Sequence, residues 1–223
     1  MYTLKNIDGI IFDMDGVIFD TEALSMRCWK KVGERHGLEN VEENIRLCIG
    51  RSTKDTKRII EEAYGDKVDL DALYAESRQV IREAFAHEGI PLKAGAREVL
   101  EWLHNSGVKV GLASSTSYDT IVSEMKEVGL IHCFDIIVGG DMIENSKPDP
   151  EIYLLACDKL GVDPENTLAV EDSRNGIISA SAAGMIPVLI PDLIEPDAEM
   201  LTRSHVKLKC LADFKNKLLS TGI

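Results

Sequence analysis

The stretch GIIFDMDGVIFDTE, residues 9–22, places four acidic residues after the first hydrophobic run of the chain. Residues 10–12 predict a short buried strand, and Asp13 and Asp15 follow it at once. A buried strand normally avoids carboxylates, because burying an unpaired charge is energetically expensive. We therefore expect Asp13 and Asp15 to meet partners from other parts of the chain where this strand ends.

The pattern of the opening, a short apolar run that ends in small or acidic residues, returns later in the chain. We interpret four such runs as buried parallel strands: VKVGLASS (108–115), FDIIVGGD (134–141), TLAVEDS (167–173) and IPVLI (186–190). Helical patterns lie between them, each followed by a glycine as a stop signal: residues 96–105, 117–128, 150–160 and 175–183. Alternating strands and helices predict βαβ units with right-handed crossovers. The fold class that we expect is α/β, with a Rossmann-like, doubly wound parallel sheet.

The stretch between the first and second predicted strands is helical in pattern and has no strand-like apolar run. Four of its apolar residues share one helical face: Leu24, Cys28, Trp29 and Val32. Further helical patterns start near residues 52–55 and cover residues 69–88. We therefore expect an all-helical cap domain at residues 21–89, inserted into a core of residues 1–20 and 90–223. Such a cap would close over a substrate, exclude bulk water and set specificity.

The composition of the chain bounds its function. The 223 residues are 44% hydrophobic and 28% charged, which is typical of a globular protein. The formal net charge of −13 argues against general binding of nucleic acid or anionic membranes, which needs a basic surface. An anionic substrate would need a locally positive site. The chain shows no signal-peptide or membrane-spanning pattern, and its cysteines are scattered singly. We expect a cytoplasmic protein and, by default, a monomer.

Ligands of an open α/β sheet bind beyond the carboxyl ends of its strands. This rule brings polar residues together at one edge: Asp13 and Asp15 after the first strand, Ser114, Ser115 and Thr116 after the second, Lys147 after the third, and Glu171 and Asp172 after the fourth. Carboxylate oxygens are the ligands that Mg²⁺ prefers, and hydroxyls and helix N-termini can hold phosphate oxygens. The set predicts phosphate chemistry with a divalent cation.

Asp13 and Asp15 can divide the chemical work of such a reaction. A carboxylate can attack phosphorus and form an aspartyl-phosphate. A second carboxyl can protonate the leaving oxygen and later take a proton from water. Bound Mg²⁺ would offset the repulsion between the attacking carboxylate and the phosphate.

Four motifs in this order resemble the haloacid dehalogenase superfamily and, within it, the β-phosphoglucomutase-like phosphatases with helical caps. The first motif begins DxDG and matches residues 13–21, and the second, a strand that ends in Ser or Thr, matches Ser114. The third matches Lys147 in SKPDP, and the fourth, an acidic pair after a strand, matches Glu171 and Asp172. The resemblance covers essentially the whole chain.

The resemblance implies a role for each matched acid. Asp13 would be the nucleophile and a metal ligand. Asp15 would be the general acid and base, and its backbone carbonyl would also contact the metal. Asp172 would be a metal ligand, and Glu171 a direct or water-mediated one.

The resemblance also implies a phosphate site. Ser114 and Lys147 would bind the transferring phosphate. Arg51 and Arg78 of the cap are further candidates for substrate contact, although a solvated surface position suits each arginine equally well. The mutases of this branch carry a histidine where this chain has Ser25, which puts mutase activity in doubt.

Each of these signals also has a simpler structural interpretation. The first two acids could lie in a calcium-type loop, but that loop needs glycine at its sixth position and Gly16 stands fourth. Ser114 could cap the following helix, and Lys147 could be a surface lysine. The acidic pair of the fourth motif could favour a helix start. Asp20 and Glu22 suit a turn or a helix cap better than chemistry.

The leading prediction is a Mg²⁺-dependent phosphatase that hydrolyses a small phosphorylated metabolite, a sugar phosphate above all, through an aspartyl-phosphate. The first alternative is a β-phosphoglucomutase, which would return the phosphoryl group to a sugar and which Ser25 disfavours. The second alternative is a non-catalytic phospholigand-binding protein on the same scaffold, which the intact catalytic set disfavours.

Overall fold

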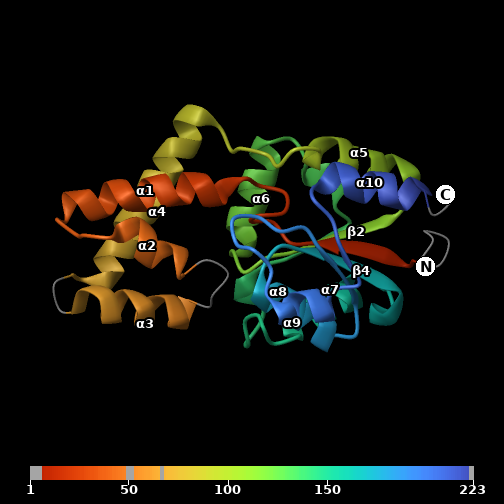
Figure 1. Ribbon diagram of the computed structural model, residues 1–223. Helices are drawn as coiled ribbons and strands as arrows, with labels where there is room; N and C mark the ends of the chain where they lie inside the picture. The colour runs from red at the N-terminus through yellow and green to blue at the C-terminus, as the bar shows by residue number, and fades with distance from the viewer. Residues whose placement is uncertain (1–6, 49–52, 66–67, 221–223) are drawn as a thin grey trace. The chain divides into compact units, whose positions relative to one another are not determined.

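The computed structural model describes residues 7–48, 53–65 and 68–220. The chain divides into two compact units, one of Met1–Phe19 with Leu92–Ile223 and one of Asp20–Pro91. The first unit is a sheet between helices, and the second is helical (Figure 1). The second unit lies where the sequence analysis places the cap domain, at residues 21–89.

The first unit is built on a parallel sheet of six strands in the order β3-β2-β1-β4-β5-β6. The strands are β1 (Gly9–Phe12), β2 (Lys109–Ala113), β3 (Ile136–Val138), β4 (Thr167–Glu171), β5 (Ile186–Leu189) and β6 (Val206–Lys207). Strand β1 is central and pairs with β2 on one side and β4 on the other. All four of its residues are buried, which explains its uninterrupted apolar run.

Helices cover both faces of this sheet. Figure 1 shows α5 (Ala96–Ser106) and α10 (Leu211–Ser220) on one face, and α7 (Glu151–Leu160), α8 (Arg174–Ala182) and α9 (Ala198–Arg203) on the other. Helix α6 (Tyr118–Glu127) connects β2 to β3. The predicted fold class is confirmed. Strand β6 and helices α9 and α10 were not predicted, and of these β6 and α9 have too few residues for a periodic pattern.

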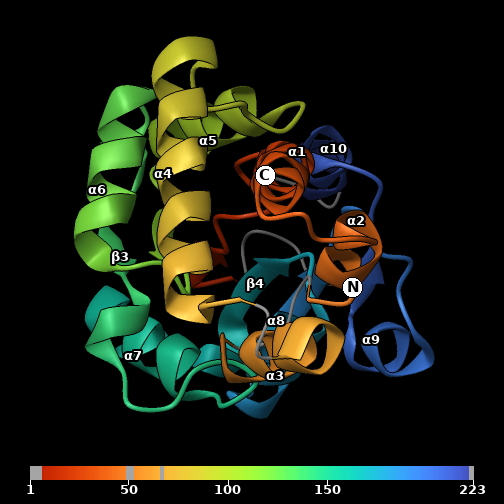
Figure 2. The ribbon, with the colours of Figure 1, turned by 90° about the vertical axis from the view of Figure 1, so that its left-hand side faces the viewer.

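The second unit contains α1 (Thr21–Arg35), α2 (Val41–Arg46), α3 (Thr53–Tyr64) and α4 (Leu70–Glu88), and Figure 2 looks towards these helices. The four residues predicted to share one face of the first helix are all buried: Leu24, Cys28, Trp29 and Val32. Trp29 meets Tyr74 of α4 edge to face, with ring centroids 5.1 Å apart. The apolar stripe of α1 therefore faces a core of its own unit. None of the helices in the described ranges is both long and apolar enough to cross a bilayer.

Candidate active site

The segment after β1 turns sharply and presents two carboxylates at the carboxyl edge of the sheet. The backbone N–H of Asp13 donates to the carbonyl of Val170 on β4 at 3.0 Å, so Asp13 continues the line of the strand. The N–H of Phe19 returns to the carbonyl of Met14 at 3.0 Å and closes the turn that carries Asp15. Asp13 is 8% exposed, whereas Asp15 is half-buried.

The lysine predicted to join this edge comes from the loop before α7. Two backbone N–H groups of that loop, of Glu144 and Asn145, donate to the Glu151 carboxylate at 2.8 Å each. The buried Ser179 of α8 donates its hydroxyl to the carbonyl of Asp149 at 2.6 Å. The loop is thus tied to α7 and α8 on both sides of Lys147.

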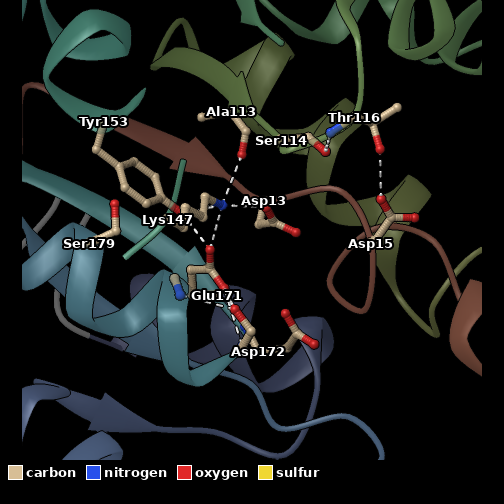
Figure 3. A network of polar contacts seen from close by, with 12 residues as sticks. Asp13, Asp15, Ala113, Ser114, Thr116, Lys147, Tyr153, Glu171, Asp172 and Ser179 are labelled. Carbon is tan, nitrogen blue, oxygen red and sulfur yellow. Dashed lines mark hydrogen bonds and ion pairs between the residues drawn. The ribbon is translucent and has the colours of Figure 1, made fainter. Parts of the chain in front are cut away.

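Lys147 lies between two buried carboxylates (Figure 3). Its Nζ is 2.5 Å from Asp13 Oδ1 and 2.6 Å from Glu171 Oε1. It also lies 3.3 Å from the carbonyl of Ala113 and 3.3 Å from the hydroxyl of Tyr153. The side chain is buried, so the surface-lysine interpretation is wrong.

Glu171, the last residue of β4, is fully buried and accepts hydrogen bonds on both oxygens. Its Oε1 accepts from Lys147 and, at 2.8 Å, from Tyr153. Its Oε2 accepts from the N–H groups of Asp172 and Ser173 at 3.1 and 3.2 Å, and from the Ser173 hydroxyl at 3.0 Å. Glu171 therefore acts in this arrangement as an anchor for Lys147 at the start of α8.

Two glycines allow these acids to approach the backbone. A Cβ on Gly16, where φ is +78°, would stand 2.2 Å from Asp172 Oδ2. A Cβ on Gly176 would stand 1.8 Å from Glu171 Oε1. Because real side chains cannot come so close, both positions require glycine. The requirement for glycine at positions 16 and 176 was not predicted from the sequence. It comes from the close approach of Asp172 and Glu171, which the sequence does not show.

The cluster has more negative than positive groups, because the single ammonium of Lys147 lies between the carboxyl groups of Asp13 and Glu171. Burial would raise the pKa of Glu171, but Lys147 and the hydrogen bond from Tyr153 lower it below its ordinary value. Burial raises the pKa of Asp13 to about 8, against the opposing effect of Lys147. Burial would lower the pKa of Lys147, but Asp13 and Glu171 raise it well above its ordinary value. Lys147 thus stays charged, and Asp13 needs a further positive charge to ionise fully.

The cluster fits a divalent cation. Asp13, Glu171 and Asp172 each offer a carboxylate oxygen, and these oxygens lie within 4.8 Å of one another. In Figure 3 the Asp13 and Asp172 carboxylates lie on the side of Lys147 that faces away from Tyr153. Hard oxygen ligands of this kind suit Mg²⁺, and its charge would complete the neutralisation that Lys147 begins. Asp15 does not belong to this set of carboxylates.

The hydroxyl residues after β2 lie beside the first two acids. Ser114 is 2% exposed, and its Oγ accepts from the N–H of Thr116 at 3.1 Å. Thr116 donates its hydroxyl to Asp15 Oδ2 at 3.2 Å, a contact that the sequence did not predict. Ser115 is exposed. The N-cap of α6 is Ser117, so the interpretation of Ser114 as the cap of that helix is wrong.

The remaining candidates belong to the second unit. Arg78 is an exposed residue of α4 in the second unit, and Arg51 lies outside the described residues. Asp20 occupies the N-cap position of α1, and Glu22 lies in its first turn, where an acid interacts favourably with the helix dipole. Tyr153 was missed, because a tyrosine within an apolar helical pattern looks like an ordinary core residue.

The order of the sheet defines a Rossmann-like α/β fold, and the acid–lysine cluster lies at its carboxyl edge, where such sheets bind their ligands. The model of the haloacid dehalogenase-like hydrolase family matches residues 10–190, and the chain belongs to this family. The predicted superfamily and the predicted class of hydrolase are thereby confirmed.

Similar proteins and structures extend over most of the chain. A "Phosphorylated carbohydrates phosphatase" of Thermotoga maritima is 34% identical over 179 residues, which cover 80% of this chain and 82% of the relative. Hexitol phosphatase B of Escherichia coli K12 is 30% identical over 232 residues, covering 97% and 98% of the two chains. A crystal structure of β-phosphoglucomutase from Clostridium difficile has a TM-score of 0.77 and covers 96% of both chains. Its 22% identity supports the shared fold alone.

Proposed function

We propose that this protein is a Mg²⁺-dependent phosphatase that hydrolyses a small phosphorylated metabolite of the sugar-phosphate class through an aspartyl-phosphate. The observation that carries the proposal is the position of Lys147, whose Nζ lies 2.5 Å from Asp13 Oδ1. A lysine at this place can neutralise the nucleophile and a phosphate oxygen together. Asp15 follows two residues later and supplies the second carboxyl that the reaction needs.

The proposed reaction has two steps. An oxygen of Asp13 attacks phosphorus, the ester P–O bond breaks, and Asp15 gives its proton to the leaving oxygen. Asp15, now a carboxylate, then takes a proton from water as the water oxygen attacks the phosphorus. The bond between Asp13 and phosphorus breaks, which releases inorganic phosphate and restores both acids. The hydrogen bond from Thr116 orients the Asp15 carboxyl for these transfers.

The second part of the proposal concerns the cation. Asp13 and Asp172 would hold Mg²⁺ with their carboxylates and Asp15 with its backbone carbonyl, while Glu171 remains engaged with Lys147 and the start of α8. Bound Mg²⁺ would supply positive charge against the phosphate oxygens. A divalent cation beside Asp13 would favour the ionised form of this nucleophile, whose pKa burial raises to about 8.

The substrate class follows from the relatives rather than from the cluster itself. Phosphatases of phosphorylated carbohydrates and of hexitol phosphates resemble this chain at 34% and 30% identity. Substrate specificity is assigned in this proposal to the helical unit, residues 20–91. The core residues act on the phosphate group alone and therefore suit many esters.

The proposal can be tested by the release of inorganic phosphate from a panel of sugar and polyol phosphates with Mg²⁺. We expect Asp13→Asn to reduce the rate by at least about a thousandfold, because the nucleophile is lost. The matched control is Asp8→Asn, the same change at the opposite end of β1, where Asp8 is exposed. Asp8→Asn should hydrolyse the esters at the wild-type rate. EDTA should abolish hydrolysis by the wild type and by Asp8→Asn. Undiminished hydrolysis by Asp13→Asn would reject the assignment.

Two other outcomes would replace the proposal by its alternatives. Conversion of β-glucose 1-phosphate to glucose 6-phosphate without free phosphate, in the presence of a trace of bisphosphate, would show a mutase. Stabilisation of the protein by phosphate esters in a thermal-shift assay, without turnover of any, would show a phospholigand-binding protein.

A further inference from the structure

The hydroxyl of Tyr153 is buried against Lys147 and Glu171. Tyr153 belongs to α7 and is fully buried, within a cluster of apolar residues. Figure 3 shows its ring on the side of Lys147 opposite to Asp15, and Tyr153 is 0% exposed. A phenol hydroxyl in such a core needs hydrogen-bond partners, and it finds both of them in the catalytic cluster.

The hydroxyl closes a triangle of hydrogen bonds. It donates to Glu171 Oε1 at 2.8 Å and accepts from Lys147 Nζ at 3.3 Å, while Nζ donates to the same Glu171 oxygen at 2.6 Å. The donor and acceptor capacity of this hydroxyl is used within the triangle.

The Lys147 side chain needs neighbouring groups to fix its ammonium between Asp13 and Glu171. Its ammonium group stands on a flexible four-carbon stem, and its three donors rotate freely. Here Nζ also lies 4.8 Å from the centroid of the Tyr153 ring, which favours a cation at this place. Removal of the hydroxyl would leave one donor of Lys147 and one lone pair of Glu171 without this partner in a buried site.

We propose that Tyr153 is a positioning residue that holds Lys147 against Asp13 through the triangle with Glu171. The proposal rests on the proposed function, because the place of Lys147 matters through the phosphate that it would bind. The hydrogen bonds of Tyr153 go to Lys147 and Glu171 rather than to the nucleophile. Tyr153 therefore acts by holding the Lys147 ammonium in place before the reaction. Its loss should affect the stability of the transition state more than the binding of substrate.

The test is Tyr153→Phe, which removes the hydroxyl and keeps the ring. We expect kcat to fall about tenfold, while KM stays within about twofold of wild type. The matched control is Tyr64→Phe in the second unit. The Tyr64 hydroxyl donates to the carbonyl of Glu39 and accepts from the Asn44 amide, both at 3.0 Å, so this variant also loses two hydrogen bonds. Its kcat and KM should both stay within about twofold of wild type.

The kinetics are measured at a temperature below the unfolding transition of all three proteins, so that a general loss of stability does not enter. A wild-type kcat for Tyr153→Phe overturns the positioning role and leaves the proposed function intact. A raised KM with an unchanged kcat also overturns it, because that pattern belongs to a group that binds substrate. Absence of turnover by the wild type itself, across the ester panel with Mg²⁺, overturns both proposals.

Discussion

The Nζ of Lys147 lies 2.5 Å from Oδ1 of Asp13, although 134 residues separate them in the chain. The ammonium group is the positive partner that makes the burial of Asp13 and Glu171 tolerable. A buried charge that loses its partner is far more costly than an exposed one. Lys147 should therefore be important for stability as well as for activity.

Lys147→Met is expected to lower the free energy of unfolding by about 3–5 kcal/mol, because the buried Glu171 carboxylate loses its counter-ion and Asp13 loses a hydrogen-bond partner. The control is Lys109→Met, since the Lys109 ammonium donates to the backbone carbonyls of Leu160 and Gly161 rather than to a buried carboxylate. Urea unfolding in EDTA measures both variants. Equal losses in the two would contradict a special role for the buried pair.

Gly16→Ala should weaken the response to Mg²⁺, because its Cβ would press against the Asp172 carboxylate. The distance to Asp172 Oδ2 would be 2.2 Å at a φ of +78°. Gly107→Ala is the control, since Gly107 has a φ of +69° and no heavy atom within 4 Å of its Cβ position. Both variants carry about 1–2 kcal/mol of backbone strain. We expect the Mg²⁺ concentration for half-maximal activity to rise roughly tenfold in Gly16→Ala alone. A similar rise in both would refute the contact.

Glu124 of α6 should make the stability of the protein depend on pH. Burial, together with the charges of Asp15 and Glu127, raises its pKa from 4.5 to about 7. Between these values the folded protein holds a proton that the unfolded chain releases, so this group lowers stability as pH rises. Glu124→Gln, neutral at every pH, should therefore stabilise the protein at pH 8 and have little effect near pH 4.5.

The same change at an exposed helical position provides the control for this pH effect. Glu61→Gln on α3 alters an exposed carboxylate and should have the same small effect at both pH values. Chemical unfolding at each pH measures the two variants. A gain for Glu124→Gln that does not grow with pH would contradict the assignment.

Lys93 and Asp192 form an ion pair in which the Asp192 side chain is only 8% exposed. Lys93→Met would leave this carboxylate without its counter-ion, and we expect a loss of about 1–3 kcal/mol in the free energy of unfolding. Arg46→Met is the comparison, because its pair with Glu42 is 55% and 48% exposed and should contribute about 0.5 kcal/mol or less. Thermal or urea unfolding distinguishes the two. Similar losses would indicate that Asp192 is solvated after all.

Much of the core fold was predictable, because each long element carries its own periodic signal. The helical patterns at residues 96–105 and 150–160 correspond to α5 (Ala96–Ser106) and α7 (Glu151–Leu160). The acids and the lysine could be gathered at one edge, because parallel strands all present their carboxyl ends on the same side. Short elements such as β6 (Val206–Lys207) were missed, since two residues make no pattern.

The details of the site were not predictable to the same degree. The resemblance implies that Glu171 is a direct or water-mediated metal ligand, and the fold in addition surrounds it with donors from Lys147, Tyr153 and the start of α8. These contacts depend on side-chain packing between β4, α7 and α8, for which a single sequence carries no periodic signal. Thr116 and Asp15 likewise meet only because β1 and β2 are neighbours in the sheet.

The sequence by itself determined which chemical groups stand at the ends of the strands, and hence the family and the inventory of the site. Its local patterns suffice for this, because a strand that ends in carboxylates is visible in four or five consecutive residues. Only the tertiary structure decided which of these groups form ion pairs and hydrogen bonds with one another. Lys147 is bonded to Asp13 and Glu171 together, and Tyr153 closes the triangle behind it. Such an arrangement arises when distant segments pack closely enough for hydrogen bonds of fixed length and direction. Contacts between distant segments leave no local pattern in the sequence.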